Sequence, residues 1–426
     1  MQKCYYPELS ETVFKETLPN GLTVVVVPRP GFSRKIAYFA TDYGAIHTKF
    51  TLDGEALEAP AGVAHYLEHK LFDLPGRDVT AEFASLGASP NAFTSYDMTA
   101  YYFSCTDNFG KSLALLLEFV STPYFTDESV EKEQGIIGQE IGMNEDNPDT
   151  RVFENLMEAM YENHPIRVPI LGTKQTIAQI TPKVLYQCHK AFYRPSNMLL
   201  CVVGDVDPEE VVRIAAEQLP GEGDKPVQRE QVWQEEMSTA TKSACANMEV
   251  AMPMFQLGFK CEPPELGETA VLQEAVGDLA AEALFGESSP LYLKLYEQGL
   301  IDTSFGGGFE TVDNMAMLTC SGDSEDPEAV RDAILEQAKI LAEEGVSQEA
   351  FLRMKRSAMG RRIRDLDSFD ATAFRVCAYH FSGFDYFRFP SVYRTVQAEQ
   401  IQEFIKRVVT EDRCSLSVVY PCEQEG

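Results

Sequence analysis

The feature that most constrains the fold is an order of helices and strands that occurs twice. In the first half of the chain, a predicted helix at residues 181–192 leads into an apolar strand at 198–203, and the same pair recurs at 398–409 and 415–420. Strand-rich runs with helices grouped between them are typical of α+β domains, each a mainly antiparallel sheet covered by helices on one face. Because 426 residues exceed what one core usually covers, the sequence predicts two duplicated half-domains.

A polar stretch separates the two halves. Residues 219–244 are rich in Glu, Gln, Gly, Ser and Thr and show little periodicity, which indicates a linker. We therefore predict a first half-domain at residues 1–222, a linker at 223–244 and a second, homologous half-domain at 245–426.

Composition and charge narrow the classes of function. The 66 acidic and 36 basic residues leave a net charge of −30, which argues against a nucleic-acid partner because no basic stripe exists to bind phosphates. An acidic surface either attracts basic peptides into a cleft or simply prevents aggregation. The N-terminal residues lack an apolar run, and no segment approaches a membrane span of about 18 residues. We therefore expect no membrane partner and a cytoplasmic location, where the ten cysteines would be reduced thiols.

Two histidines four residues apart indicate a metal site. His65, Glu68 and His69 fall within about one third of the circumference of a helix, because each residue turns about 100°. Two imidazoles on one helical face can bind a zinc ion, and the neighbouring carboxylate can reach water activated by the metal. This order, H-x-x-E-H, is the inverted form of a common metallopeptidase signature.

The corresponding helix of the second half has no histidine. Its residues 279–285 read Leu-Ala-Ala-Glu-Ala-Leu-Phe, which indicates that apolar side chains satisfy the packing of this helix equally well. The histidines are therefore an addition to one copy, and a chemical reason for them is favoured over a structural one.

A catalytic zinc site needs a third protein ligand. Glu133 and Glu140 are seven residues apart and share one face of a long predicted helix at 127–144. Solvated helix faces show the same spacing, so the pattern alone leaves open whether these glutamates bind metal. The other histidines are isolated in the sequence and are interpreted as surface or core residues: His47, His164, His189 and His380.

Ordered motifs along nearly the whole chain carry a resemblance to a known family. They are residues 18–24 (Leu-Pro-Asn-Gly-Leu-Thr-Val), 65–69, 91–95 (Asn-Ala-Phe-Thr-Ser) with Thr99 and Tyr101, 123–125, 131–133 with 139–141, 193–198 (Tyr-Arg-Pro-Ser-Asn-Met) and 204–205. In these motifs the chain resembles the zinc peptidases that include pitrilysin, the insulin-degrading enzyme and the mitochondrial processing peptidase. That many matches in one order make coincidence implausible.

The resemblance implies roles for the residues of the metal motif. His65 and His69 look like ligands of one Zn²⁺ per chain, and Glu140 is implied as the third ligand. Glu68 would be the general base, and Glu133 would orient a ligand. The implied activity is that of a zinc metalloendopeptidase that cleaves peptides or small unfolded polypeptides, although the same ligands would also accept Mn²⁺ or Co²⁺.

The resemblance also implies how substrate is held. Asn91, Ala92 and Phe93 match the family's edge strand, to which a peptide adds as one more strand. The implied architecture is a clam-shell assembly, in which a closed chamber forms only when two such chains face each other.

One departure from the family pattern concerns substrate binding. Active members carry an arginine and a tyrosine seven residues apart in the second type of half-domain, whereas here Tyr296 occupies the arginine position and Thr303 or Ser304 the tyrosine position. We therefore expect the zinc-bearing subunit of a heterodimer whose paralogous partner supplies the Arg/Tyr pair, with a homodimer as the alternative. Two other functions stay open, a non-catalytic scaffold subunit and a protease dedicated to leader peptides; the intact zinc motif favours an enzyme over a scaffold.

Overall fold

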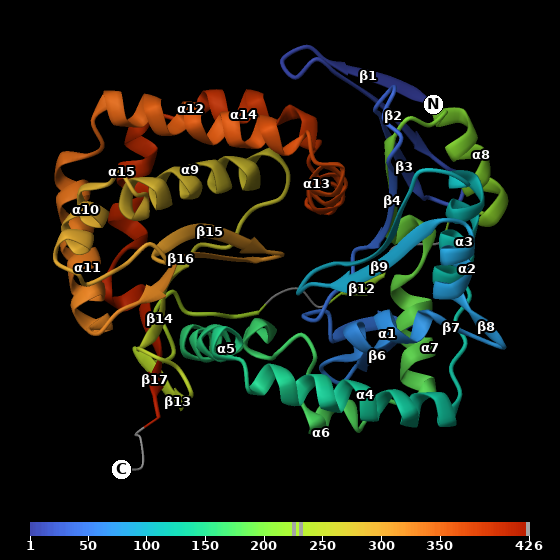
Figure 1. Cartoon of the computed structure of the whole chain (residues 1–426), viewed down its shortest axis with the longest axis horizontal. Coiled ribbons are helices and arrows are strands. Elements are labelled where there is room, and N and C mark those ends of the chain that lie inside the picture. Colours follow the sequence, from blue (N-terminus) through green and yellow to red (C-terminus); the bar gives the residue numbers. More distant parts are fainter. Residues whose placement is uncertain (224–226, 230–232, 423–426) are drawn as a thin grey trace. The chain divides into compact units, whose positions relative to one another are not determined.

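The structure, a computed structural model of the chain, describes residues 1–223, 227–229 and 233–422 (Figure 1). Parts of the predicted linker at 223–244, namely 224–226 and 230–232, lie outside the described residues. The chain forms two compact units. Within the described ranges, unit 1 comprises Met1–Ile141, Pro169–Gln231 and Ile363–Arg388, and unit 2 comprises Gly142–Val168, Val232–Arg362 and Phe389–Gly426. Each unit therefore includes a segment from the other half of the sequence.

Unit 1 is built on a seven-stranded sheet. Its strands are, in spatial order, β1 (Gln2–Tyr6), β2 (Glu11–Thr17), β3 (Thr23–Pro28), β11 (Met198–Gly204), β4 (Lys35–Thr41), β10 (Thr99–Cys105) and β9 (Ala88–Thr94). β3 and β11 run parallel, and the other neighbours in this sheet are antiparallel. Short strands form two small sheets beside it: β12 (Gln228–Arg229), β5 (Lys49–Leu52) and β6 (Glu55–Glu58), and the pair β7 (Asp73–Leu74) and β8 (Arg77–Asp78).

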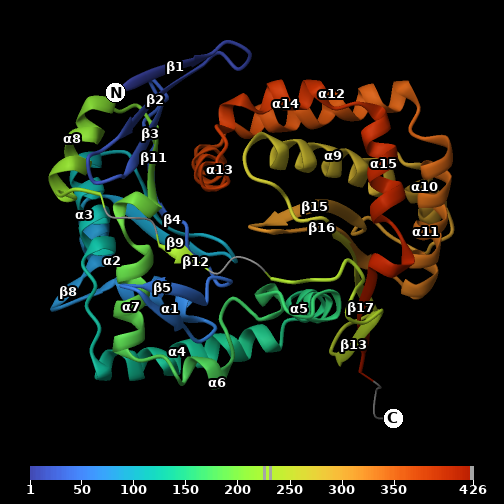
Figure 2. The ribbon, with the colours of Figure 1, turned by 180° about the vertical axis from the view of Figure 1, so that it is seen from behind.

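Helices cover both faces of this sheet, whereas the sequence predicts them on one face. They are α1 (Val63–Leu71), α2 (Val79–Ser85), α3 (Phe109–Ser121), α4 (Asp127–Glu145), α6 (Lys174–Ile177), α7 (Pro182–Phe192), α8 (Pro208–Gln218) and α13 (Phe369–Phe381). The last turn of α4, after Ile141, belongs to unit 2. Cys201 and Val202 are neighbours in β11 and both are fully buried, although neighbouring side chains point to opposite faces of a sheet. The reason is that α3 packs on β4 and β10, whereas α13 packs on β4 and β11 from the opposite side (Figures 1 and 2).

Unit 2 repeats this plan with five strands. Their order is β13 (Ser243–Met248), β17 (Cys414–Pro421), β14 (Met254–Cys261), β16 (Met315–Asp323) and β15 (Gly306–Val312), with β13 parallel to β17. The helices are α5 (Pro148–Met160), α9 (Glu268–Phe285), α10 (Pro290–Glu297), α11 (Pro327–Glu344), α12 (Gln348–Asp365, as far as Arg362), α14 (Phe389–Thr395) and α15 (Ala398–Val408). α5 comes from the first half of the sequence and packs on β14 and β17, so the exchange of helices is reciprocal.

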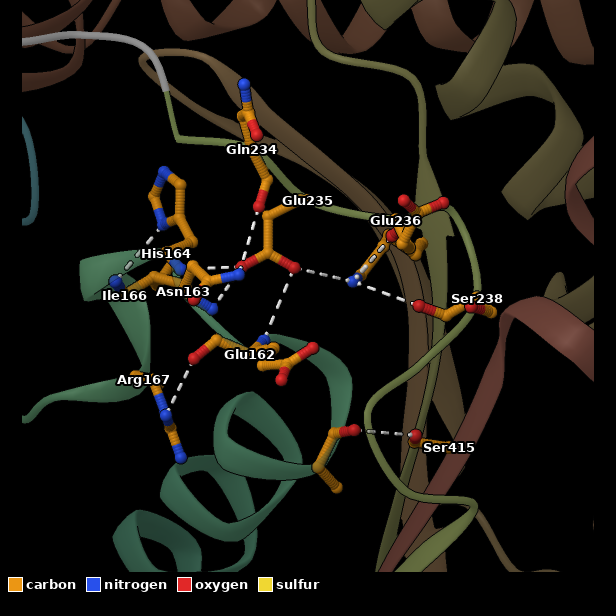
Figure 3. A network of polar contacts seen from close by, with 12 residues as sticks. Glu162, Asn163, His164, Ile166, Arg167, Gln234, Glu235, Glu236, Ser238 and Ser415 are labelled. Atoms are coloured by element: carbon orange, nitrogen blue, oxygen red, sulfur yellow. Dashed lines mark hydrogen bonds and ion pairs between the residues drawn. The ribbon is translucent and has the colours of Figure 1, made fainter.

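The exchanged helix α5 is anchored in unit 2 by one carboxylate. Glu235 accepts hydrogen bonds from the backbone N–H groups of Asn163 at 2.5 Å and His164 at 2.6 Å, just beyond the end of α5 (Figure 3). The buried ammonium of Lys260, on β14, lies 3.0 Å from the same carboxylate. Burial alone would raise the pKa of Glu235, but these hydrogen bonds and Lys260 hold it below its ordinary value. The ionised carboxylate thus ties the end of α5 to the sheet.

The prediction of an α+β fold with two similar sheet-containing halves is confirmed. The two helix–strand pairs that indicate the duplication are α7 with β11 and α15 with β17. Among the strands that the sequence did not predict is β15, because it begins with three glycines and lacks an apolar run. None of the described helices is long and apolar enough to cross a bilayer, and the cytoplasmic location stays a prediction. All ten cysteines lie in the described residues and are free thiols.

Candidate metal and peptide-binding site

The start of α1 is set by a close crossing of two chain segments. Gly62 has a φ of +92°, and a Cβ there would lie 2.4 Å from the carbonyl oxygen of Leu171. Gly172 has a φ of +70°, and its Cβ would lie 2.4 Å from the carbonyl oxygen of Ala61. Only glycine adopts these angles freely and leaves room for the approach. The crossing therefore determines where α1 begins and places His65 in its first turn.

Two hydrogen bonds fix α1 against the start of α4. The Tyr66 hydroxyl donates to the backbone carbonyl of Val130. One helical turn later, the Lys70 ammonium donates to the carbonyl of Ser129 at 3.3 Å and pairs with Asp73 at 2.6 Å. The Lys70 side chain is only 1% exposed, so these partners are required to offset its desolvation. Together the two contacts fix the rotation of α1 about its axis, and with it the direction of the two histidines.

α1 and α4 bring three candidate metal ligands together. Nε2 of His65 lies 3.7 Å from one carboxylate oxygen of Glu140, and Nε2 of His69 lies 3.7 Å from the other. These distances are too long for hydrogen bonds but close to the roughly 3.3 Å expected between two donors on a tetrahedral zinc ion. In the part of the chain that the structure describes, no other group of three such residues occurs, and the donor atoms of this one lie within 4.8 Å of one another.

The state of His65 fits that of a metal ligand. Burial, and then the neighbouring His69, lower the pKa of His65 to about 3, so the imidazole is neutral at physiological pH. Its Nδ1 is buried without a hydrogen-bond partner, while its Nε2 faces Glu140 beyond hydrogen-bonding distance. Buried polar groups normally have partners. A divalent cation between Nε2 of His65 and the Glu140 carboxylate would give Nε2 a partner, although it would not reach Nδ1 on the other side of the ring.

Glu133 is hydrogen-bonded to the second imidazole. Its carboxylate accepts a hydrogen bond from Nδ1 of His69 at 2.9 Å. This bond raises the pKa of His69, and it leaves Nε2 as the nitrogen whose lone pair faces Glu140. Such a carboxylate–histidine pair is the usual support of a metal-bound imidazole. Glu133 and Glu140 thus share one face of α4, as their spacing predicts, and both face the two histidines, which the spacing left open.

Glu68 is hydrogen-bonded not to α4 but to Thr94 on β9. The Thr94 hydroxyl donates a hydrogen bond of 2.6 Å to the Glu68 carboxylate. Burial raises the pKa of Glu68, and this hydrogen bond offsets part of the rise. Thr94 lies in the motif at 91–95, but the sequence prediction gave it no role in the site. It is two residues after Ala92, and side chains two apart in a strand share a face. The two-residue period of the strand was therefore the signal that could have identified Thr94 as a site residue.

Asn91, Ala92 and Phe93 lie on β9, which ends the order of the seven-stranded sheet and pairs with β10. One edge of β9 therefore has no neighbouring strand, although the backbone N–H of Ala92 donates to Oδ1 of Asn91 at 2.9 Å. An open depression of ≈ 350 Å³ lies beside it, and its lining includes Asn91 and Ala92 together with Glu68, His69 and Glu133. The structure thus brings the predicted edge strand and the predicted metal motif to one place in unit 1.

Comparison with known proteins identifies the family. The model of the insulinase family, peptidase family M16, matches residues 54–174, and that of the peptidase M16 inactive domain matches residues 179–358. The uncharacterized zinc protease YmfH of Bacillus subtilis is 38% identical over 425 residues, which cover 98% of each chain. The chain belongs to peptidase family M16. The family resemblance inferred from the sequence motifs is therefore confirmed.

Solved structures share the fold of this chain. An M16-like peptidase from Alicyclobacillus acidocaldarius superposes with a TM-score of 0.93 at 33% identity and covers 98% of this chain and 100% of that one. A protease from Helicobacter pylori has the same fold, with a TM-score of 0.82 at 18% identity over 96% of this chain and 99% of that one. The periplasmic protease PqqL of Escherichia coli has a TM-score of 0.74 at 18% identity, and this M16 chain spans 48% of its length.

The second half of this M16 chain holds ion pairs where the first half holds its candidate ligands. α9 and α12 have the same places in the order of elements as α1 and α4. Arg361 of α12 lies 3.0 Å from the carboxylate of Glu282 on α9. Arg362, which is buried, pairs with Glu274 and with Asp278, the latter at 3.3 Å. Opposite charges therefore join this pair of helices.

An aromatic cluster lies on the other face of β9. Phe93 contacts Tyr102 of β10, with ring centroids 6.3 Å apart, and Phe374 of α13 at 5.7 Å. Phe374 remains 42% exposed, so the cluster presents apolar surface beside the edge strand. Sequence reasoning missed Phe374 because it lies 281 positions after Phe93 and reaches it only through the exchanged helix.

Three of the isolated histidines are buried and satisfied, as the sequence interpretation expects. His189 shares a hydrogen bond of 2.9 Å with the carbonyl of Val120, and burial lowers its pKa to about 4. Nδ1 of His47 accepts from the backbone N–H of Gly44 at 2.9 Å. Nδ1 of His164 accepts from the backbone N–H of Ile166 at 3.1 Å, and its Nε2 donates to the side-chain carbonyl oxygen of Asn314 at 2.9 Å. These contacts explain the three rings without a metal.

Proposed function

We propose that this M16 protein is a zinc metalloendopeptidase and that unit 1 carries its metal chemistry. The observation that carries the proposal is the convergence of the His65, His69 and Glu140 donor atoms within 4.8 Å, beside the half-buried Glu68. One zinc ion per chain would be held by these three side chains, with Glu133 orienting His69. When bound, zinc in such a site supplies Lewis acidity, which polarises a carbonyl and makes water a nucleophile near neutral pH.

Glu68 is the proposed general base and acid. It takes a proton from the attacking water as the water oxygen bonds to the scissile carbonyl carbon. It then gives a proton to the amine nitrogen as the C–N bond breaks. Burial raises the pKa of its carboxyl group, which suits a group that must both accept and return a proton near neutral pH.

The proposed substrate is an extended peptide that adds to β9. The outer edge of Asn91, Ala92 and Phe93 would pair with its backbone, with the Asn91 side chain releasing the Ala92 N–H. Main-chain pairing is independent of side-chain identity. This mode selects unfolded segments, because a folded substrate has no free strand to offer. The net charge of −30 favours basic peptides among them.

The proposed assembly is a heterodimer in which this chain supplies the zinc site. In place of the arginine of the family's substrate-binding pair the chain has Tyr296, on α10, which is 50% exposed. A paralogous chain that lacks the zinc motif but carries the Arg/Tyr pair would complete the substrate-binding site. Two such chains facing each other would enclose a chamber, as in the clam-shell assembly implied by the resemblance.

The activity is tested by metal analysis and cleavage of an unstructured basic peptide. We expect about one zinc per chain, with Mn²⁺ or Co²⁺ as the measured alternatives, and turnover that is lost on chelation. Glu68→Gln should retain the metal and lose about 10²- to 10⁴-fold in kcat. Glu131→Gln removes the same negative charge from an exposed position on α4, and it should leave both zinc content and kcat unchanged. A protein without metal, whose activity is the same in Glu68→Gln, would instead be a non-catalytic scaffold subunit.

The assembly is tested by adding the partner. We expect the purified chain alone to turn over peptide slowly, and activity to rise when a paralogous chain with the Arg/Tyr pair is added in equal amount. Size-exclusion chromatography with light scattering would show whether the two chains form one complex. Full activity of the isolated chain as a homodimer would contradict the heterodimer.

A further inference from the structure

Thr94 joins the proposed base to the strand on which substrate is proposed to add. It lies at the end of β9, two residues after Ala92, and its backbone pairs with Thr99 of β10. Its side chain leaves the strand towards α1 and donates to one carboxylate oxygen of Glu68 at 2.6 Å. This is a short hydrogen bond, as expected when the acceptor is ionised.

The hydrogen bond restricts a side chain that would otherwise have several orientations. A glutamate has three side-chain torsions, and the last one is broad. Glu68 is on a helix whose rotation is already fixed by Tyr66 and Lys70, but these contacts do not determine where its carboxylate points. With one oxygen bound to Thr94, the other is left for proton transfer.

We propose that Thr94 is a positioning residue for catalysis: its hydroxyl holds the Glu68 carboxylate in the orientation that takes up and returns the proton. This inference rests on the proposed function of Glu68. It also means that the edge strand has two tasks, since the strand that pairs with the peptide backbone also fixes the base relative to that backbone.

A purely structural role explains Thr94 less well. Its strand position needs only a β-branched side chain, which valine provides with nearly the same shape. The side chain is partly exposed, so the hydroxyl is not needed to satisfy a buried donor. The contact that requires a hydroxyl is the one with Glu68.

The test compares two conservative variants of the intact protein. Thr94→Val keeps the shape and removes the hydroxyl, whereas Thr94→Ser keeps the hydroxyl and removes the methyl group. We expect Thr94→Val to lower kcat about 10- to 100-fold with KM and zinc content within about twofold of wild type. Thr94→Ser should recover most of the kcat. Equal loss in both variants, wild-type kcat in Thr94→Val, or a loss confined to KM would overturn the proposal.

A structural readout separates this proposal from the proposed activity. In crystal structures of the zinc-loaded proteins, Glu68 should have one orientation in the wild type and in Thr94→Ser, and a different or divided one in Thr94→Val. The same single orientation in all three would refute the positioning role, whatever the activity. Failure of the proposed function would appear instead in the wild type, as peptide turnover that does not depend on zinc or on Glu68.

Discussion

Replacing Glu133 by glutamine should weaken zinc binding without disturbing the fold. Glu133 accepts a hydrogen bond from Nδ1 of His69 at 2.9 Å, and its side chain is 15% exposed. Glutamine has the same shape and can still accept this bond through its amide oxygen, so the change removes mainly a negative charge. A cation on the far nitrogen of the ring would lie about 7 Å from that charge.

The magnitude follows from Coulomb's law. Two unit charges about 7 Å apart interact by about 2 kcal/mol at an effective dielectric constant of about 20, and a divalent ion shares part of its charge with its ligands. Removal of a carboxylate that supports a metal-bound histidine typically costs 10- to 100-fold in metal affinity. Both arguments give a zinc Kd that rises about 10- to 100-fold in Glu133→Gln.

Two measurements check this expectation. Competition with a chelator of known affinity gives the zinc Kd directly. Unfolding at fixed, saturating free zinc should show about 1.4 to 2.8 kcal/mol less stabilisation by the metal, while the apoproteins differ little. Glu131→Gln is the matched control, since it removes the same charge from an exposed position on the same helix. If Glu133→Gln binds zinc within about threefold of this control, the role assigned to Glu133 is wrong.

Three further expectations concern other parts of the molecule. Chelation should increase hydrogen exchange in α1 and α4 but not in α9 and α12, whose contacts are Arg–carboxylate pairs; equal changes in both pairs would contradict this. Because the folded pKa of His189 is lowered to about 4, the unfolded chain binds its proton first, and stability is lost as pH falls from about 6.5 towards 4. Between pH 7 and 4.5, the free energy of unfolding measured in urea should therefore fall by about 2 kcal/mol less in His189→Gln than in the wild type. An identical fall in both proteins would count against this assignment. Phe374→Ser should lower kcat/KM selectively for peptides with a large apolar residue on the α13 face of the added strand, since Phe374 packs on Phe93 there. A series of peptides with alanine at each position in turn measures this effect. A uniform loss of kcat/KM across the series would argue against an apolar subsite.

The parts of the site that the sequence could indicate are those set by local geometry. His65, Glu68 and His69 share a helical face because of the 3.6-residue period, and Glu133 and Glu140 share another for the same reason. The spacing did not say that these two faces meet. In the structure, the two faces meet because Tyr66 and Lys70 bond to the start of α4 and because Gly62 and Gly172 let α1 begin at the crossing with another segment.

By itself, the sequence determined the α+β class, the duplicated order of elements, the metal motif and the family. These depend on periodicities and motifs that extend over a few residues, so they are visible in the sequence itself. Tertiary structure alone decided which separate segments touch: Thr94 on Glu68, Phe374 on Phe93, and the reciprocal placement of α5 and α13. Such contacts join residues tens to hundreds of positions apart, and packing selects them from many pairings that the sequence pattern permits equally well.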